Sequence, residues 1–83
     1  MRTKINQKDD QGLWQGLWKH YWYNSKNLMC KGSFLNDKRI GLWEWYYENG
    51  KLWMKGSFLE DKEIGTWKEY NKKGILVEVT YHH

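Results

Sequence analysis

The sequence predicts an all-β fold: a single-layer antiparallel meander of stacked hairpins, with about six or seven strands and no major helix. Three observations support this prediction. The 83 residues include no alanine, the best helix former, and no proline. Aromatic residues make up 18% of the chain, a load that argues against intrinsic disorder. The chain also repeats itself, and its aromatic and aliphatic runs are separated by Asn-Gly and Lys-Gly pairs, which are hairpin signals.

The repeats predict the domain organisation. One unit spans residues 16–40, a second spans 41–64, and a terminal half-repeat spans 65–83. All three units begin with G-x-W-x-x-Y, but only the first two continue to G-S-F-L, so the third is expected to act as a cap. Residues 1–15 resemble a degenerate half-repeat and form the predicted N-terminal cap of a repeat domain at 16–83.

The Asn49-Gly50 pair is the strongest turn signal in the chain. A two-residue type I′ turn needs positive φ at both central positions, and Asn-Gly is the pair that suits it best. Such a turn would place Tyr46 opposite Trp53 and, further along the hairpin, Trp43 opposite Gly56.

The other connections are predicted to be four-residue loops, at residues 36–39 and 60–63. With this loop length Phe58 would lie between Gly41 and Gly65, and large rings would alternate with glycines across the sheet. This alternation indicates a closely packed row, because a ring at every position would clash.

Residues that pair across strands share a face, so this register assigns each side chain to a face. The predicted core lies on one face, which we call the tryptophan face. Its four predicted rows are Trp18, Gly32, Trp43, Gly56 and Trp67; Gly16, Phe34, Gly41, Phe58 and Gly65; His20, Cys30, Trp45, Met54, Glu69 and Glu78; and Trp22, Leu28, Tyr47, Leu52 and Leu76.

The opposite face, which we call the lysine face, is predicted to interleave rings with lysines. Its aromatic row is Tyr21, Met29, Tyr46, Trp53, Tyr70 and Val77, and its charged row is Lys19, Lys31, Glu44, Lys55 and Lys68. The predicted partner-binding residues are the anchors Tyr21, Tyr46, Trp53 and Tyr70, with Lys19, Lys31, Lys55 and Lys68 steering an acidic target. The alternative interpretation is a solvated face whose lysine stems lie along tyrosine rings.

Catalysis would need a nucleophile with a base, paired carboxylates or a metal. His20 and Cys30 face each other in the predicted register, but we interpret them as packing residues because nothing orients the imidazole. Glu69 and Glu78 form another predicted pair, which exposure in the terminal half-repeat explains. The sequence has no phosphate-binding glycine loop and no metal-ligand spacing. We therefore expect no enzyme activity, no metal and no cofactor.

The repeat skeleton resembles the MORN repeat variant family over about residues 12–81. The best-matching residues are Gly41, Trp43, Tyr46, Asn49, Gly50, Lys51, Leu52 and Gly56. The resemblance implies a single-layer sheet of stacked hairpins and no catalytic residue. Bacterial members include YwqK-type antitoxins, and better-known members are scaffolds, some proposed to touch membranes or phosphoinositides. The last half-repeat departs from the pattern, with Thr80 and His82 where Gly and Phe would stand.

These features together predict a non-catalytic protein-interaction module. Its most specific version is a small inhibitor, either an antitoxin or immunity protein or a phage-encoded factor, that occludes a partner protein with an acidic surface. A homodimer is a further option. The single Cys30, the missing basic and apolar leader and the lack of an 18-residue apolar run predict a cytoplasmic protein of a bacterial cell or a phage-infected host.

Two alternative functions stay open at this point. Single-stranded nucleic acid could bind the lysine face, because bases stack on rings and phosphates pair with lysines, although Glu44 interrupts the row. Choline or another cell-wall ligand is the second, since W-Y-Y-x-N-G-K is similar to choline-binding repeats, whose rings cage a quaternary ammonium. Those repeats are shorter and belong to secreted proteins.

Overall fold

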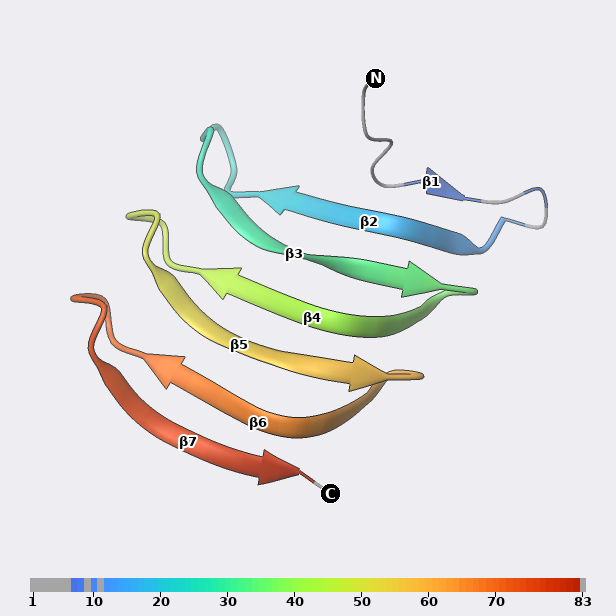
Figure 1. Ribbon diagram of the computed structural model, residues 1–83. Helices are drawn as coiled ribbons and strands as arrows, with labels where there is room; N and C mark the ends of the chain where they lie inside the picture. The colour runs from blue at the N-terminus through green and yellow to red at the C-terminus, as the bar shows by residue number, and fades with distance from the viewer. Residues whose placement is uncertain (1–6, 9, 11, 83) are drawn as a thin grey trace.

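The computed structural model describes residues 7–8, 10 and 12–82, and they form one antiparallel sheet (Figure 1). Each strand pairs with the next one along the chain, and no helix occurs among the described residues. The predicted fold class is therefore confirmed. Residues 1–6, 9 and 11 of the predicted N-terminal cap lie outside the described residues. The strands are β1 (Gln7–Lys8), β2 (Trp14–Tyr21), β3 (Leu28–Leu35), β4 (Lys38–Tyr46), β5 (Leu52–Leu59), β6 (Lys62–Tyr70) and β7 (Leu76–His82).

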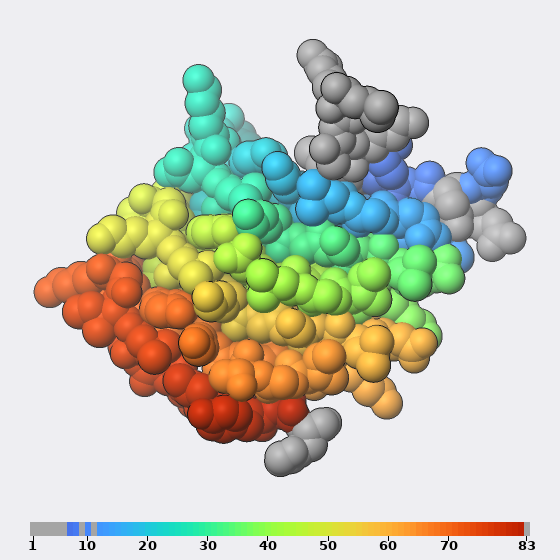
Figure 2. Space-filling view, in the orientation of Figure 1, coloured from blue at the N-terminus to red at the C-terminus, as the bar shows by residue number. Residues whose placement is uncertain are grey.

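The order of the strands in space follows the order of the chain. Figure 2 shows this as successive bands of colour across one face of the molecule, from β2 to β7. A meander of this kind places equivalent residues of successive repeats in rows that run across the strands. The function of the chain therefore depends on which residues each row brings to which face.

The hairpin at Asn49-Gly50 closes through a three-residue loop rather than the predicted type I′ turn. The Gly50 N–H donates to the Tyr47 carbonyl at 2.9 Å, and the Tyr47 N–H donates to the Lys51 carbonyl at 2.9 Å. Only Gly50 of the pair has positive φ, at 88°, so a type I turn is followed by a left-handed glycine. The Asn49 side chain accepts a hydrogen bond from the Lys51 N–H at 2.9 Å, which stabilises this loop.

A bulge in β5 compensates for the longer loop. Tyr46 pairs with Leu52 and not with Trp53, whereas Trp45 pairs with Met54 as predicted. Trp53 is the extra residue of the bulge, and the predicted Tyr46–Trp53 pair is wrong. The same shift recurs in the other two hairpins of this kind, so the pairs at this level are Tyr21 with Leu28, Tyr46 with Leu52, and Tyr70 with Leu76.

The connections at the opposite ends of the strands are two-residue turns, where the sequence predicted four-residue loops. Asn36 and Asp37 have φ of 50° and 68°, and Glu60 and Asp61 have φ of 49° and 67°. Two consecutive positive φ values define a type I′ turn. A residue of β4 stabilises the turn at Glu60-Asp61. The Asp61 carboxylate accepts a hydrogen bond from the Arg39 N–H at 2.8 Å, and the Asp61 N–H donates to the Arg39 carbonyl at 3.1 Å.

Shorter turns make the flanking strands longer and change their register. Arg39 pairs with Phe34, and Glu63 pairs with Phe58, so both charged residues share the face of the phenylalanines. The prediction that Gly65 flanks Phe58 is therefore wrong, and Glu63 takes that position. Gly65, at φ 69°, lies where the register shifts back to the predicted one.

The core lies on the tryptophan face, as predicted. Trp43, Phe58 and Trp67 are the buried hydrophobic residues among those described. Trp18, Cys30, Phe34, Trp45 and Met54 pack against them. Ring edges meet ring faces, with Phe58 and Trp67 centroids 5.0 Å apart at 86°.

Two glycines make room for the buried tryptophans. A Cβ atom added at Gly56 would overlap the ring of Trp67, and one added at Gly32 would overlap the ring of Trp43. Trp43 also pairs directly with Gly56. The predicted alternation of large rings and glycines in this row is confirmed.

Candidate functional site

The predicted charged row of the lysine face is continuous across five strands. Neighbouring strands are about 4.8 Å apart, so the row brings its charges close together. Two of its cross-strand pairs oppose like charges, an arrangement that is destabilising unless countercharge is near. The pairs run from β2 to β6 as Lys19 with Lys31, Lys31 with Glu44, Glu44 with Lys55, and Lys55 with Lys68.

The middle of the lysine face is a cluster of three polar side chains. Lys31 Nζ lies 3.6 Å from Glu44 Oε1, and Tyr46 lies beside both. The pKa of the Lys31 ammonium is raised, first by its interaction with Tyr46 and then by Glu44. Burial, with Glu44 adding to it, raises the pKa of the Tyr46 hydroxyl. At neutral pH the cluster thus presents a charged lysine beside a neutral phenol.

The β5 bulge removes Trp53 from the lysine face. Its ring centroid lies 5.9 Å from that of Tyr47, and its Nε1 donates to Glu69 Oε2 at 3.4 Å. Both neighbours belong to the tryptophan face, because Tyr47 lies two residues beyond Trp45 and Glu69 pairs with Met54. The structure therefore does not bring Trp53 together with the other predicted anchors.

Leucines replace Trp53 and its equivalents on the lysine face. Tyr46 lies on this face with Glu44, two residues before it, and its partner Leu52 shares the face. The sequence placed the leucines with the core, which the register contradicts. The row beside the lysines is Tyr21, Leu28, Tyr46, Leu52, Tyr70 and Leu76, of which Tyr21 and Leu76 are exposed and the others half-buried.

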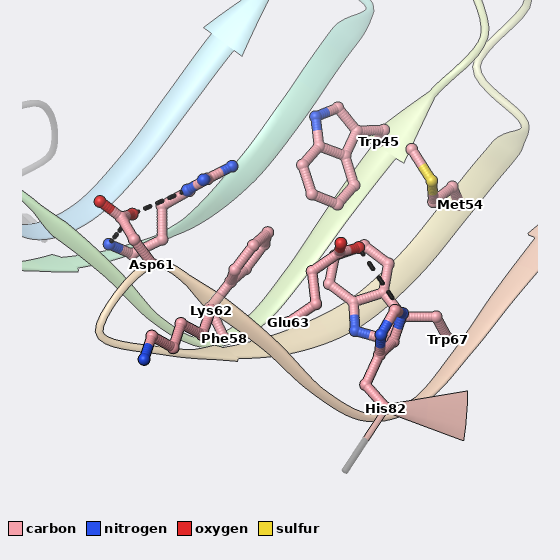
Figure 3. A pocket seen from close by; sticks show the side chains of 9 residues that line it. Trp45, Met54, Phe58, Asp61, Lys62, Glu63, Trp67 and His82 are labelled. Atoms are coloured by element: carbon pink, nitrogen blue, oxygen red, sulfur yellow. Dashed lines mark hydrogen bonds and ion pairs between the residues drawn. The ribbon is translucent and has the colours of Figure 1, made fainter. Parts of the chain in front are cut away.

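The tryptophan face carries a hollow of about 520 Å³ that the sequence did not reveal (Figure 3). A second hollow of about 100 Å³ adjoins it. The first is lined by the apolar residues Trp45, Met54, Phe58 and Trp67, and by Arg39, Asp61, Lys62, Glu63 and His82. The second shares four of these residues and adds Lys68, Glu69, Glu78 and Thr80.

One guanidinium of the chain already occupies part of the larger hollow. The Arg39 guanidinium carbon lies 4.2 Å from the centroid of the Phe58 ring. Its Nε donates to Asp61 Oδ1 at 2.9 Å, the same oxygen that accepts the Arg39 backbone N–H. A planar cation is thus held between an aromatic face and a carboxylate.

Asp61 gives a pH prediction. Hydrogen bonds from the Arg39 N–H and then from its guanidinium hold the pKa of the Asp61 carboxyl below its ordinary value. The carboxylate therefore stabilises the fold above its ordinary pKa, and this stability is lost as the pH falls through the lower folded-state pKa. We expect Asp61→Asn to lower the melting temperature at pH 7, and the difference from the unchanged protein to shrink as the pH falls toward about 2.

Thermal unfolding followed by circular dichroism over this pH range measures the difference. Glu60→Gln, in the same turn, is the control. A melting-temperature difference for Asp61→Asn that is the same at both pH values would contradict the assignment.

His82 lines the hollow at the C-terminal edge of the sheet. It pairs with Gly65 as Phe58 pairs with Gly41, so it occupies the phenylalanine position of the repeat, as the sequence indicated. Its ring centroid lies 6.0 Å from that of Trp67, and its Nε2 lies 3.8 Å from Glu63 Oε2.

The two pairs considered for chemistry form in the predicted register. His20 faces Cys30, and Glu69 faces Glu78. The exposed His20 ring stacks on Trp18, with centroids 6.3 Å apart and 5° between planes. Burial raises the pKa of the Cys30 thiol, which disfavours the thiolate that a nucleophile needs.

In the part of the chain that the structure describes, no group of three or more His, Cys, Asp or Glu residues is placed to hold a metal ion. None of the described residues forms a helix long and apolar enough to cross a membrane.

Comparison with known proteins identifies the repeat. Residues 39–60 match the family model of the MORN repeat variant. The match spans most of the β4–β5 hairpin, whose bulge recurs in β2–β3 and β6–β7 and whose three-residue loop recurs in β6–β7. No curated protein and no solved structure matches the chain. Repeats of this family are generally non-catalytic, and the absence of enzyme activity in this chain stays a prediction.

Proposed function

We propose, from the match of residues 39–60 to the MORN repeat variant, that this chain is a non-catalytic protein-interaction module that docks on the acidic surface of a partner protein. In its most specific form it is a small inhibitor, an antitoxin or immunity protein or a phage-encoded factor, that acts by occlusion. The lysine face is the docking surface. Its anchors are Tyr21, Tyr46 and Tyr70 with the intervening leucines, and Lys19, Lys31, Lys55 and Lys68 steer the acidic partner.

The single observation that carries this proposal is the alternation of tyrosine and leucine beside a row of lysines. Tyrosine is enriched in protein interfaces, where its ring supplies apolar contact area and its hydroxyl a polar handle. Single-stranded nucleic acid is held by stacking successive bases on successive rings. Leu28, Leu52 and Leu76 interrupt any such stack, so the corrected register favours a protein partner.

Electrostatics support an acidic partner. The chain has a formal net charge of +4, and the Lys55–Lys68 pair sets two lysines directly opposite each other on neighbouring strands. A carboxylate from a partner would relieve that repulsion. An acidic surface therefore gains more binding free energy at this pair than it would at one isolated lysine. Complementary charge of this kind mainly accelerates association and selects the partner.

The test compares two double variants with equal charge change. Lys55→Gln with Lys68→Gln removes the opposed pair from the lysine face, whereas Lys72→Gln with Lys73→Gln removes two exposed lysines from the β6–β7 loop. We expect the unchanged protein and the loop variant to capture the same acidic protein from the native host. The lysine-face variant should bind the purified partner about tenfold more weakly by calorimetry.

Equal binding by both double variants would remove the lysine face from the proposal. Capture that disappears after nuclease treatment, with an affinity for oligonucleotides that falls steeply with salt, would replace it by nucleic-acid binding.

A further inference from the structure

We propose that the two adjoining hollows on the tryptophan face together bind the guanidinium group of an arginine side chain presented by a protein or peptide. This site lies on the face opposite to the lysine face. The two proposals are therefore independent, and a result that contradicts one leaves the other unaffected.

The walls of the hollow suit a flat cation. The Trp45 and Trp67 ring centroids lie 5.6 Å apart with 33° between the ring planes, and Met54 lies beside them. Guanidinium stacks on aromatic faces because it is planar, delocalised and more weakly hydrated than an ammonium. In Figure 3 the Trp45 and Met54 side chains lie across the hollow from Asp61.

Three carboxylates, those of Glu63, Glu69 and Glu78, line the smaller hollow together with a single lysine, Lys68. Glu69 and Glu78 are directly opposite each other on β6 and β7, and Glu63 lies at the rim they share. Like charges in opposed positions destabilise a sheet. None of the ion pairs among the described residues involves Glu69 or Glu78. A cation from outside would relieve this repulsion. The Glu69 carboxylate already accepts one hydrogen bond, from the Trp53 indole at 3.4 Å.

The chain itself shows how a guanidinium is held here. Arg39 lies over Phe58 and pairs with Asp61 within the same hollow. At the equivalent position of the next repeat, the second residue of β6, the chain has Glu63 instead of an arginine. The described side chains beside Trp67 in the smaller hollow thus include rings and carboxylates but no guanidinium. An arginine fits these groups better than a lysine, because its planar fork can bond two carboxylates while it stacks.

The experiment is an NMR titration of the ¹⁵N-labelled protein with the peptide acetyl-Gly-Arg-Gly-amide. The control peptide carries citrulline, which keeps the planar shape without the charge. We expect the indole N–H signals of Trp45 and Trp67 to shift saturably with the arginine peptide and not with the citrulline peptide. Glu69→Gln with Glu78→Gln should weaken binding about tenfold, and Glu63→Gln should weaken it less. Glu48→Gln removes one exposed carboxylate from the loop between β4 and β5 and should leave the affinity unchanged.

Three results would overturn the site. The indole N–H signals could fail to shift, the citrulline peptide could bind as tightly as the arginine peptide, or the double glutamine variant could bind the arginine peptide as tightly as the unchanged protein. Tighter binding of choline than of the arginine peptide would instead assign the hollow to a small quaternary ammonium. The backbone amide spectrum of each variant reports whether its sheet is intact, and Glu63→Gln is the second test if the double variant does not fold.

Discussion

Replacing Trp43 by alanine is expected to lower the free energy of unfolding by about 3–5 kcal/mol. Trp43 has the lowest exposure of the buried core residues, at 3%. Its ring contacts Phe34 and Phe58 with centroids 5.1 and 6.2 Å away, and its Nε1 donates to the Ser33 carbonyl at 3.1 Å. A domain of this size has a total stability of about 4–12 kcal/mol, so this loss is a large share of it.

Urea denaturation followed by far-ultraviolet circular dichroism measures this loss. Tyr23→Ala is the control, because its side chain is 89% exposed and its removal should change stability by less than about 0.5 kcal/mol. A Trp43→Ala variant that stays within about 1 kcal/mol of the unchanged protein would show that the core does not depend on this ring.

The middle of each strand could be predicted from the sequence because steric fit allows one register there. The ring of Trp43 lies over Gly32 and the ring of Trp67 over Gly56, where a Cβ atom would overlap each ring. The register that allows these contacts also places Trp45 opposite Met54 and Glu44 opposite Lys55. The charged row followed from the same register and is correct. Repetition within the chain then extended this register from one hairpin to the others.

The ends of the strands could not be predicted because their turns depend on distant residues. Glu60-Asp61 adopts a type I′ turn because Asp61 bonds to Arg39, which is 22 residues away in the sequence. No local signal shows this contact. Asn-Gly was the better local candidate for that turn type, yet the Asn49 side chain stabilises a longer loop.

Each misjudged turn changed the predicted sites. The longer loop at Asn49-Gly50 moved Trp53 to the tryptophan face and brought leucines to the lysine face. The shorter turn at Glu60-Asp61 brought Glu63 onto the sheet beside Phe58 and so created the rim of the hollow. At the first turn a one-residue slip moved side chains to the opposite face, whereas at the second a two-residue shift kept the face and changed the partner. Small errors in turn length therefore altered the candidate site more than the fold.

Replacing Gly56 by alanine is expected to cost about 3 kcal/mol of unfolding free energy, although it adds only one methyl group. That methyl would overlap the Cδ2 and Cε2 atoms of Trp67. The ring has little room to retreat, because Phe58 and Trp45 contact it at centroid distances of 5.0 and 5.6 Å. In an open strand the same substitution would be neutral or stabilising, since glycine loses more backbone entropy on folding than alanine does.

A double-mutant cycle isolates this clash from other effects of the methyl group. Trp67→Leu removes the ring that the methyl would strike, at the cost of core burial. The double variant Gly56→Ala with Trp67→Leu should therefore lose about 1–2 kcal/mol less than the sum of the two single losses in urea denaturation. Ser57→Ala, at the next position and on the other face, is the control for a small change in β5. Strictly additive losses would mean that the tryptophan does not pack over Gly56, and the steric argument for the register of the central strands would fail with it.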